Sequence, residues 1–214
     1  MGFATDRDLL VLEPGLFREV GWSAQRVVEA SGVSVSGTTL TSAGSDFVTA
    51  GVTAGHVALV NGAVMEVVAR LSATQLTVSR VREEAGGVAI PPGTMSGATL
   101  VVMTFRAQLS VAHGQVLRML GIEPGSVGQL GEVGETSIVN PGSLARVEAL
   151  GAMHAILSSA SAMVGETSAT WAKAEAYRER FREERQRVAA LIDLNGDGVA
   201  DATRRMSVTR LTRA

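Results

Sequence analysis

The segment His56-Val-Ala-Leu-Val-Asn-Gly-Ala-Val-Met-Glu-Val-Val-Ala-Arg70 places two apolar runs on either side of Asn61-Gly62. Asn-Gly is a strong signal for a β-hairpin, because both central residues of a type I′ turn need positive φ. The flanking runs are rich in Val and other residues that favour strands. This segment therefore predicts two antiparallel strands joined by a tight turn.

The same β pattern extends from Trp22 to about Phe105, where Val, Thr, Ser and Gly dominate and apolar residues alternate. Turn signals recur roughly every 8–12 residues, as in small barrels and sandwiches. Few crossover helices fit between them, so the strands should be antiparallel. We predict an inserted antiparallel β-barrel or β-sandwich lobe over residues 21–104. Its expected strands are residues 26–30, 33–35, 39–41, 56–60, 65–70, 75–79 and 99–103.

Helical periodicity appears on both sides of this region. Thr5 is the expected N-cap of a short first helix, with Asp6 and Asp8 in its first turn. The segment from Glu123 to about Asn140 is glycine-rich and lacks periodicity, and we expect it to order against a partner. The class is α+β, with residues 1–20 and 105–214 forming an α-helical bundle lobe. The expected helices are residues 5–13, 105–120 and 141–164, and a last helix that starts at Ser168 or Thr170 and ends at about residue 191.

Composition excludes several classes of protein. The 214 residues are 46% hydrophobic, enough for one domain of two lobes or two small domains. A net charge of −2 provides no global attraction to nucleic acid or an anionic membrane. The absence of Cys excludes disulfides and thiolate chemistry. Residues 149–164 are apolar but short and interrupted by His154, which favours a buried helix over a membrane span. The first residues show no pattern of a secretion signal.

Catalytic motifs are not found in the sequence. The three His residues are scattered, and there is no nucleophile elbow, phosphate loop, dinucleotide pattern or metal-binding histidine pair. Carboxylates are paired only at Glu83-Glu84 and Glu183-Glu184, where adjacent side chains diverge. The sequence therefore predicts a protein that is not an enzyme.

The segment Lys173–Val188 concentrates Arg and Glu on a predicted helix. Opposite charges three and four residues apart stabilise such a helix by only a few tenths of a kcal/mol. One interpretation is a solvated outer face. The other is a helix that packs beside copies of itself, with Arg–Glu pairs crossing between the subunits of a ring. The expected apolar stripe is Ala174, Tyr177, Phe181, Val188 and Ile192. The candidate inter-subunit residues are Arg178, Arg182, Arg185, Glu175, Glu179 and Glu183.

An acidic turn, Asp193-Leu-Asn-Gly-Asp-Gly198, follows this helix and matches the start of a twelve-residue calcium loop. Arg204 occupies the last position of that pattern, where a bidentate acid is expected. The alternative is an Asp/Asn/Gly turn whose side chains bond backbone amides. Apart from Ca²⁺, no cofactor is expected. The candidate ligands are Asp193, Asn195, Asp197, Val199 through its carbonyl, and Asp201.

The last segment, residues 203–213, contains four Arg and no acidic residue. It could serve as an arm that docks on a protein partner, bind phosphate groups or an acidic groove, or be a frayed end. DNA would be a weaker, salt-sensitive partner. We expect that deleting residues 203–214 leaves folding intact.

Several of these segments follow one another in a characteristic order. A short helix at Asp6–Leu12 and a helix from Phe105 precede Ser137-Ile-Val-Asn-Pro141, which opens a helix. A charged helix over 173–187 then leads into Ile192-Asp-Leu-Asn-Gly-Asp-Gly-Val-Ala-Asp201. Over residues 1–20 and 105–214 this order resembles head-to-tail connector (adaptor) proteins of tailed bacteriophages and phage-like gene transfer agents. The β segment is similar to small barrels of virion proteins, in Gly37-Thr-Thr-Leu40, Phe47, Gly51-Val-Thr-Ala-Gly55 and Gln75-Leu-Thr-Val-Ser-Arg80. Many adaptors lack such an insert.

The resemblance implies a structural virion protein that forms a dodecameric ring below the portal protein. Such a ring joins the phage head to the tail at the neck and extends the viral DNA channel toward a stopper or tail-terminator protein. DNA would pass without sequence-specific contacts, no membrane is involved, and assembly would occur in the cytoplasm of the bacterial host. Alternatives are a tail-terminator or other neck or tail ring protein, or a calcium-stabilised binding module. The implied portal-binding arm is Ser207, Val208, Thr209, Arg210, Leu211, Thr212, Arg213 and Ala214.

Overall fold

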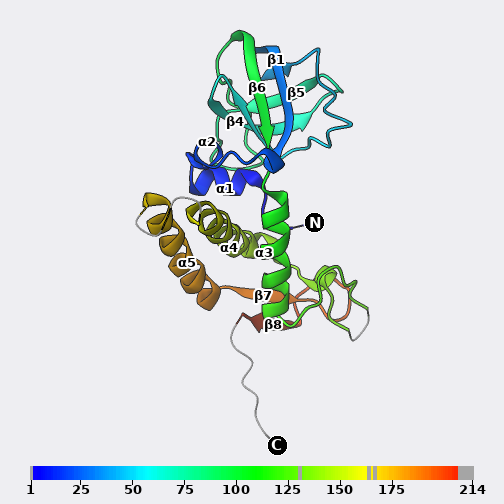
Figure 1. Cartoon of the computed structure of the whole chain (residues 1–214). Coiled ribbons are helices and arrows are strands. Elements are labelled where there is room, and N and C mark those ends of the chain that lie inside the picture. Colours follow the sequence, from blue (N-terminus) through cyan, green and yellow to red (C-terminus); the bar gives the residue numbers. More distant parts are fainter. Residues whose placement is uncertain (1, 130–131, 163–164, 166–167, 207–214) are drawn as a thin grey trace, which may run out of the picture. The chain divides into compact units, whose positions relative to one another are not determined.

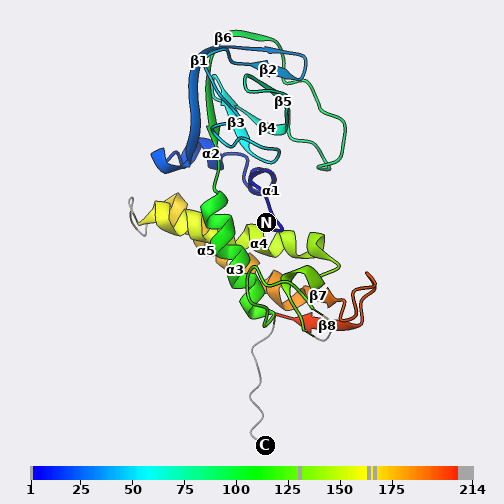
Figure 2. The same ribbon diagram turned by 90° about the vertical axis from the view of Figure 1, so that its right-hand side faces the viewer.

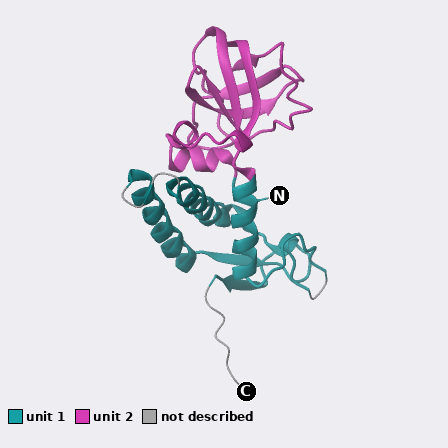
Figure 3. Ribbon diagram, in the orientation of Figure 1, with its two compact units in different colours: residues 1–4, 107–214 teal, residues 5–106 magenta. Residues whose placement is uncertain are grey.

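The structure, a computed structural model, describes residues 2–129, 132–162, 165 and 168–206 (Figure 1). These residues form five α-helices, a six-stranded closed barrel and a two-stranded sheet. The predicted α+β class is therefore confirmed. The chain divides into two compact units, residues 5–106 and residues 1–4 with 107–214 (Figure 3).

The barrel unit begins with two short helices, α1 (Asp6–Leu12) and α2 (Leu16–Glu19), and a 3-10 turn, η1 (Ser23–Gln25). Its strands close in the order β1-β2-β5-β4-β3-β6, and every pairing is antiparallel. Figure 2 shows β1 and β6 side by side along the wall. The insert is thus a barrel and not a sandwich. The strands are β1 (Arg26–Ser36), β2 (Thr39–Thr41), β3 (Val57–Val60), β4 (Ala63–Arg70), β5 (Gln75–Ser79) and β6 (Met95–Met103).

The predicted hairpin is confirmed at Asn61-Gly62, which joins β3 to β4. Asn61 has φ 48° and Gly62 has φ 76°, as a type I′ turn requires. The Asn61 side chain also accepts a hydrogen bond of 2.9 Å from the backbone N–H of Thr99 on β6. The turn therefore fixes the register of three neighbouring strands.

The prediction of two separate strands at residues 26–30 and 33–35 is wrong, because β1 runs through both. The strand continues across Gly32, which has φ 71°, and its pairing with β6 shifts register between Ala30 and Val33. Glycine tolerates this β-bulge conformation without a steric penalty. A bulge keeps both halves in one sheet where the sequence suggests a break.

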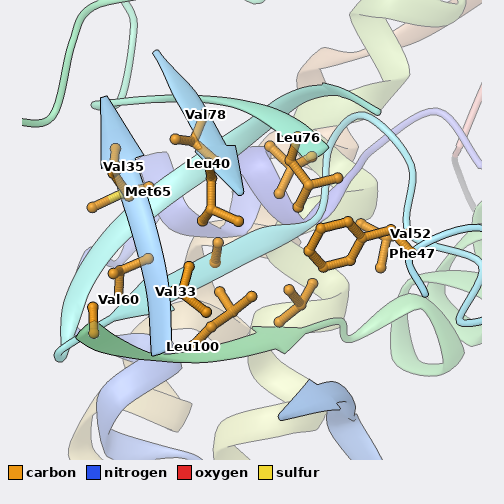
Figure 4. Close-up of a cluster of buried hydrophobic side chains, with 14 residues drawn as sticks. Val33, Val35, Leu40, Phe47, Val52, Val60, Met65, Leu76, Val78 and Leu100 are labelled. Carbon is orange, nitrogen blue, oxygen red and sulfur yellow. The ribbon is translucent and has the colours of Figure 1, made fainter. Parts of the chain in front are cut away.

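The barrel core consists of the inward-facing members of the alternating pattern (Figure 4). Phe47 and Val52 come from the long loop between β2 and β3, and their side chains lie together in this core (Figure 4). The backbone N–H of Phe47 donates to Ala73 O at 2.7 Å, which fixes the loop on the turn after β4. The core is completed by Val33, Val35, Leu40, Ala58, Val60, Met65, Val67, Leu76, Val78, Ala98, Leu100 and Val102.

The helical unit contains three longer helices, and α4 and α5 pack along one another (Figure 1). Pro141 occupies the first position of its helix, as predicted. Ser168 caps the last helix, accepting a hydrogen bond from the N–H of Trp171 at 3.2 Å. The elements are α3 (Arg106–Met119), η2 (Glu135–Ser137), α4 (Pro141–Ser161), α5 (Ala169–Arg187), β7 (Ala189–Ile192) and β8 (Ala202–Arg205).

The predicted extent of the last helix is wrong at its C-terminal end, because α5 stops at Arg187 and the chain becomes β7. β7 pairs with β8 and also with Ile138. The side chain of Asn140, the residue before α4, makes no cap hydrogen bond; it donates to Ala189 O and accepts the N–H of Leu191. These partners lie far away in sequence, so helical periodicity could not reveal the strand.

The boundary between the units also differs from the predicted division. The prediction places residues 1–20 in the helical lobe, whereas residues 5–20 belong to the same compact unit as the barrel. The backbone N–H of Arg7 donates to Gly55 O at 3.1 Å, and its side chain pairs with Glu66 on β4. These long-range contacts attach α1 to the barrel.

Candidate assembly surface and buried polar clusters

Helix α5 presents most of its charged side chains to solvent. Its buried residues are Ala174 and Tyr177, two members of the predicted apolar stripe. Phe181 packs against the helical core in partial burial, whereas Val188 and Ile192 lie beyond the helix. The narrow apolar seam is therefore real but shorter than predicted.

The candidate inter-subunit residues form ion pairs along the helix surface. Arg178 lies 3.2 Å from Glu175, and both side chains are more than one third exposed. Arg182 lies 3.7 Å from Glu179, with exposed fractions of 66% and 58%. Glu183 pairs with Arg187 at 3.9 Å. Such exposed pairs contribute little to stability. Their side chains are therefore free to exchange partners at little cost.

Arg185 differs from the other candidates because it points toward its own chain. Its Nη1 lies 3.9 Å from the sulfur of Met119 at the end of α3. The side chain is therefore shared between α5 and α3, and it is a less suitable inter-subunit residue than Arg178 or Arg182.

The acidic turn after β7 is held by its own side chains. The Asp193 carboxylate accepts backbone N–H groups of Asn195, Gly196 and Gly198 at 3.0, 2.6 and 2.7 Å. The N–H groups of Gly198 and Gly196 lower the pKa of this carboxyl. The predicted alternative, a turn closed by bonds to backbone amides, is therefore confirmed.

The other predicted calcium ligands make local contacts of the same kind. Asp197 accepts the N–H of Val199 at 2.8 Å, and Asp201 accepts the N–H of Leu194 at 2.8 Å. The Asn195 amide donates to Asp197 at 3.2 Å. Across the part of the chain that the structure describes, no group of three or more acidic or histidine side chains is placed to hold a metal ion.

Arg204, which replaces the expected last calcium ligand, has a different structural role. Its Nη1 donates to Leu120 O and Gly121 O, each at 3.1 Å, just after the C-terminal end of α3. A cation at this end of a helix complements the macrodipole and satisfies unpaired carbonyls. The residue that weakens the calcium pattern thus anchors β8 to α3.

A hollow of about 170 Å³ lies between the acidic turn and the glycine-rich segment. Its wall includes Asp193 of the acidic turn and Thr136 of the glycine-rich segment. No pattern in the sequence indicates that these two segments meet. The lining residues are Gly128, Gln129, Thr136, Ser137, Asp193, Leu194, Asn195 and Gly196.

The helical unit contains a buried charged cluster that was not predicted from the sequence. His113 on α3 lies between Glu148 on α4, at 2.8 Å from Nδ1, and Glu135 in η2, at 3.1 Å from Nε2. Glu148 has an exposed fraction of 0% and also accepts the backbone N–H groups of Phe3 and Ala4. Glu148 is the single acidic residue in the sequence of the apolar helix α4. Because a buried carboxylate without a partner is costly, this residue could have indicated the cluster.

A second buried cluster lies in the barrel unit around Glu66 on β4. The carboxylate accepts a hydrogen bond of 2.6 Å from Nε of Arg82 and one of 2.8 Å from Nε of Arg7. It also accepts the backbone N–H of Arg82 at 3.0 Å. One carboxylate therefore joins α1 and the segment after β5 to the barrel wall.

The portal-binding arm implied by the resemblance, residues 207–214, lies outside the described residues. The longer Arg-rich segment, residues 203–213, is not a free arm throughout, since Ala202–Arg205 form β8 and Met206 is buried in the helical core. Comparison of the chain with protein families, with curated proteins and with solved structures found no match. None of the described helices has both the length and the apolar character needed to cross a membrane.

Proposed function

We propose that this chain is a structural subunit of a phage-type neck. Copies of it assemble into a ring below the portal protein, join head to tail and extend the DNA channel toward a stopper or tail-terminator protein. In this proposal the helical lobe forms the ring and the barrel is an inserted accessory lobe. The protein acts by assembly, without catalysis and without a cofactor.

The observation that carries the proposal is the surface of α5. One narrow side of this helix packs in its own subunit, and the remaining sides carry exposed Arg and Glu in weak pairs. Arg forms bidentate pairs with carboxylates, which suits it to ion pairs at interfaces. A surface that carries both charges in alternation supports contact with an equivalent surface on a neighbouring copy. The order of segments that resembles adaptor proteins supports the same conclusion.

The direct test is to image the full chain alone and mixed with the portal protein of the same particle. Light scattering over a range of concentrations and electron microscopy would report the assembled state. We expect rings, formed either by the chain alone or on the portal, because neighbours stabilise one another by mass action. A chain that stays monomeric under both conditions would overturn the proposal.

Charge reversal on α5 tests the proposed interface. We expect Arg178→Glu combined with Arg182→Glu to raise the concentration needed for ring formation by roughly 10- to 100-fold, since like charges then face each other across the contact. Circular dichroism should show unchanged helix content. The matched control is Arg26→Glu, which reverses an exposed arginine of the Arg26–Glu29 pair on β1. Equal effects of the control and the α5 variant would exclude α5 as the interface.

Truncation tests the implied arm. We expect a chain lacking residues 207–214 to fold normally and to lose portal binding by at least about tenfold. A chain lacking 203–214 is a poor test, because it also removes most of β8 and the buried Met206. Binding assays with immobilised portal, paired with thermal unfolding, would separate the two effects. Wild-type binding by the 207–214 deletion would contradict the assignment.

A further inference from the structure

His113 is the centre of a line of contacts that joins four segments of the helical unit. On one side Glu148 accepts the N–H groups of Phe3 at 3.1 Å and Ala4 at 3.2 Å. On the other side Glu135 accepts the N–H of Gly125 at 2.9 Å. The residues before α1, helices α3 and α4, and the glycine-rich segment are therefore linked through one imidazole ring.

The contacts of His113 require one more proton than a neutral imidazole and two ionised carboxylates carry. A neutral imidazole has one N–H group and can donate to one carboxylate. Here a carboxylate oxygen lies within hydrogen-bond distance of each ring nitrogen of His113. Both contacts are satisfied only when the cluster carries one additional proton, either on the ring or on Glu148. Burial raises the pKa of Glu148, against the opposing effect of its hydrogen bonds, which helps the pair to retain that proton.

The two ends of the line respond differently when the additional proton is lost. Glu148 is fully buried, so the remaining N–H of the ring is needed there to avoid an unsatisfied buried acceptor. The Glu135 side chain is 18% exposed and can exchange the ring for water. Glu135 is therefore the end that separates from His113.

We propose that His113 is a proton-dependent clasp for the glycine-rich segment. With the additional proton it holds Glu135, and through it residues 123–129 and 135–137, on the helical core. Loss of the proton releases this segment, whereas Phe3 and Ala4 stay bound to Glu148. The charged groups facing the ring are Glu148 from α4 and Glu135 from η2, and the Phe3 ring lies 4.6 Å from it, centroid to centroid. Further along α3, Arg118 lies near Gly114.

Amide hydrogen exchange measured by NMR on the full chain tests the clasp and does not depend on ring formation. Exchange rates are corrected for their intrinsic pH dependence, and the His113 ring is titrated in the same samples. Over a pH series that removes the additional proton, as followed by the His113 ring signals, we expect protection of residues 123–129 to fall by about tenfold. Protection at Phe3 and Ala4 should remain.

Two variants decide the result. In Glu135→Gln the side-chain amide can donate to a neutral ring, so protection of residues 123–129 should no longer depend on pH. The control is His154→Gln, since His154 lies on α4 near Ala174 O and Ser158 and should not affect the clasp. Unchanged protection in the wild type across this range would overturn the proposal. So would a pH dependence in Glu135→Gln equal to that of the wild type.

Discussion

Replacing Glu66 with alanine is expected to destabilise the barrel unit by about 3–5 kcal/mol, because it leaves two buried guanidinium groups without their carboxylate. The Glu66 side chain is 1% exposed, and those of Arg7 and Arg82 are 11% and 8% exposed. Water therefore has little access to replace the lost contacts. Glu66→Gln keeps the shape and one acceptor oxygen, and we expect a smaller loss.

Urea unfolding measures this effect if the signal comes from the barrel unit. Trp22 lies in that unit, with its ring centroid 6.2 Å from that of Phe105, whereas Trp171 lies on α5. A Trp171→Phe background therefore isolates the unfolding of the barrel, which need not coincide with that of the other unit. The control is Glu29→Ala, which removes the exposed partner of Arg26 and should cost no more than about 0.5 kcal/mol. Equal losses in Glu66→Ala and Glu29→Ala would refute the predicted role of the network.

Asp6 is expected to make the stability of the barrel unit depend on pH. Burial raises the pKa of Asp6 to about 6, although hydrogen bonds from Thr104 and Phe105 oppose the shift. Its carboxylate accepts the Thr104 hydroxyl and the Phe105 N–H, both at 2.6 Å. These contacts join the start of the unit to its end, so the group cannot move to solvent without breaking them.

The sign follows from the protons bound in each state. Between pH 4 and pH 6 the folded chain keeps the Asp6 proton that the unfolded chain has released, so stability falls as pH rises through this range. The difference between the ordinary aspartate pKa of 3.8 and about 6 corresponds to about 3 kcal/mol of unfolding free energy. Asp6→Asn keeps an acceptor and cannot ionise. We therefore expect the stability of this variant relative to the wild type to increase by about 3 kcal/mol from pH 4 to pH 8.

The same Trp22 signal, followed in urea at several pH values, provides the measurement. Asp46→Asn is the control, because hydrogen bonds from Thr49 lower the pKa of Asp46. The Asp46 carboxylate therefore loses its contribution to stability only at pH values below the ordinary pKa range of aspartate. The stability of Asp46→Asn relative to the wild type should not rise between pH 4 and pH 8. If the difference in stability between Asp6→Asn and the wild type does not change with pH, burial does not retain the Asp6 proton.

Features set by neighbouring residues were predictable from the sequence. The Asn61-Gly62 turn, the start of α4 at Pro141 and the cap at Ser168 all depend on backbone preferences within a few residues. The alternating pattern of the barrel strands likewise indicated an antiparallel all-β region. Local steric preferences and hydrophobic periodicity were therefore sufficient to predict the α+β class and the positions of most elements.

Features that depend on distant partners were not predictable in this way. Residues 189–192 continue a helical pattern, yet they pair with β8 and meet Ile138, which no local preference encodes. In the same way β1 remains one strand across Gly32 because β6 supplies a continuous partner. Hydrogen bonds to a neighbouring strand outweigh intrinsic helix or turn preferences, which amount to fractions of a kcal/mol per residue.

The charged residues show most clearly which features could be predicted from the sequence and which depend on distant partners. The exposed pairs of α5 follow from spacing along one helix and were read from the sequence. Glu66 and Arg7 are 59 positions apart, and His113 and Glu148 are 35 positions apart, so only folding brings them together. Whether a charge is buried, and which partner compensates it, depends on the surrounding volume and not on adjacent residues. Spacing along the chain thus established the helices, the hairpin and the exposed charges, while the three-dimensional packing established the two buried clusters.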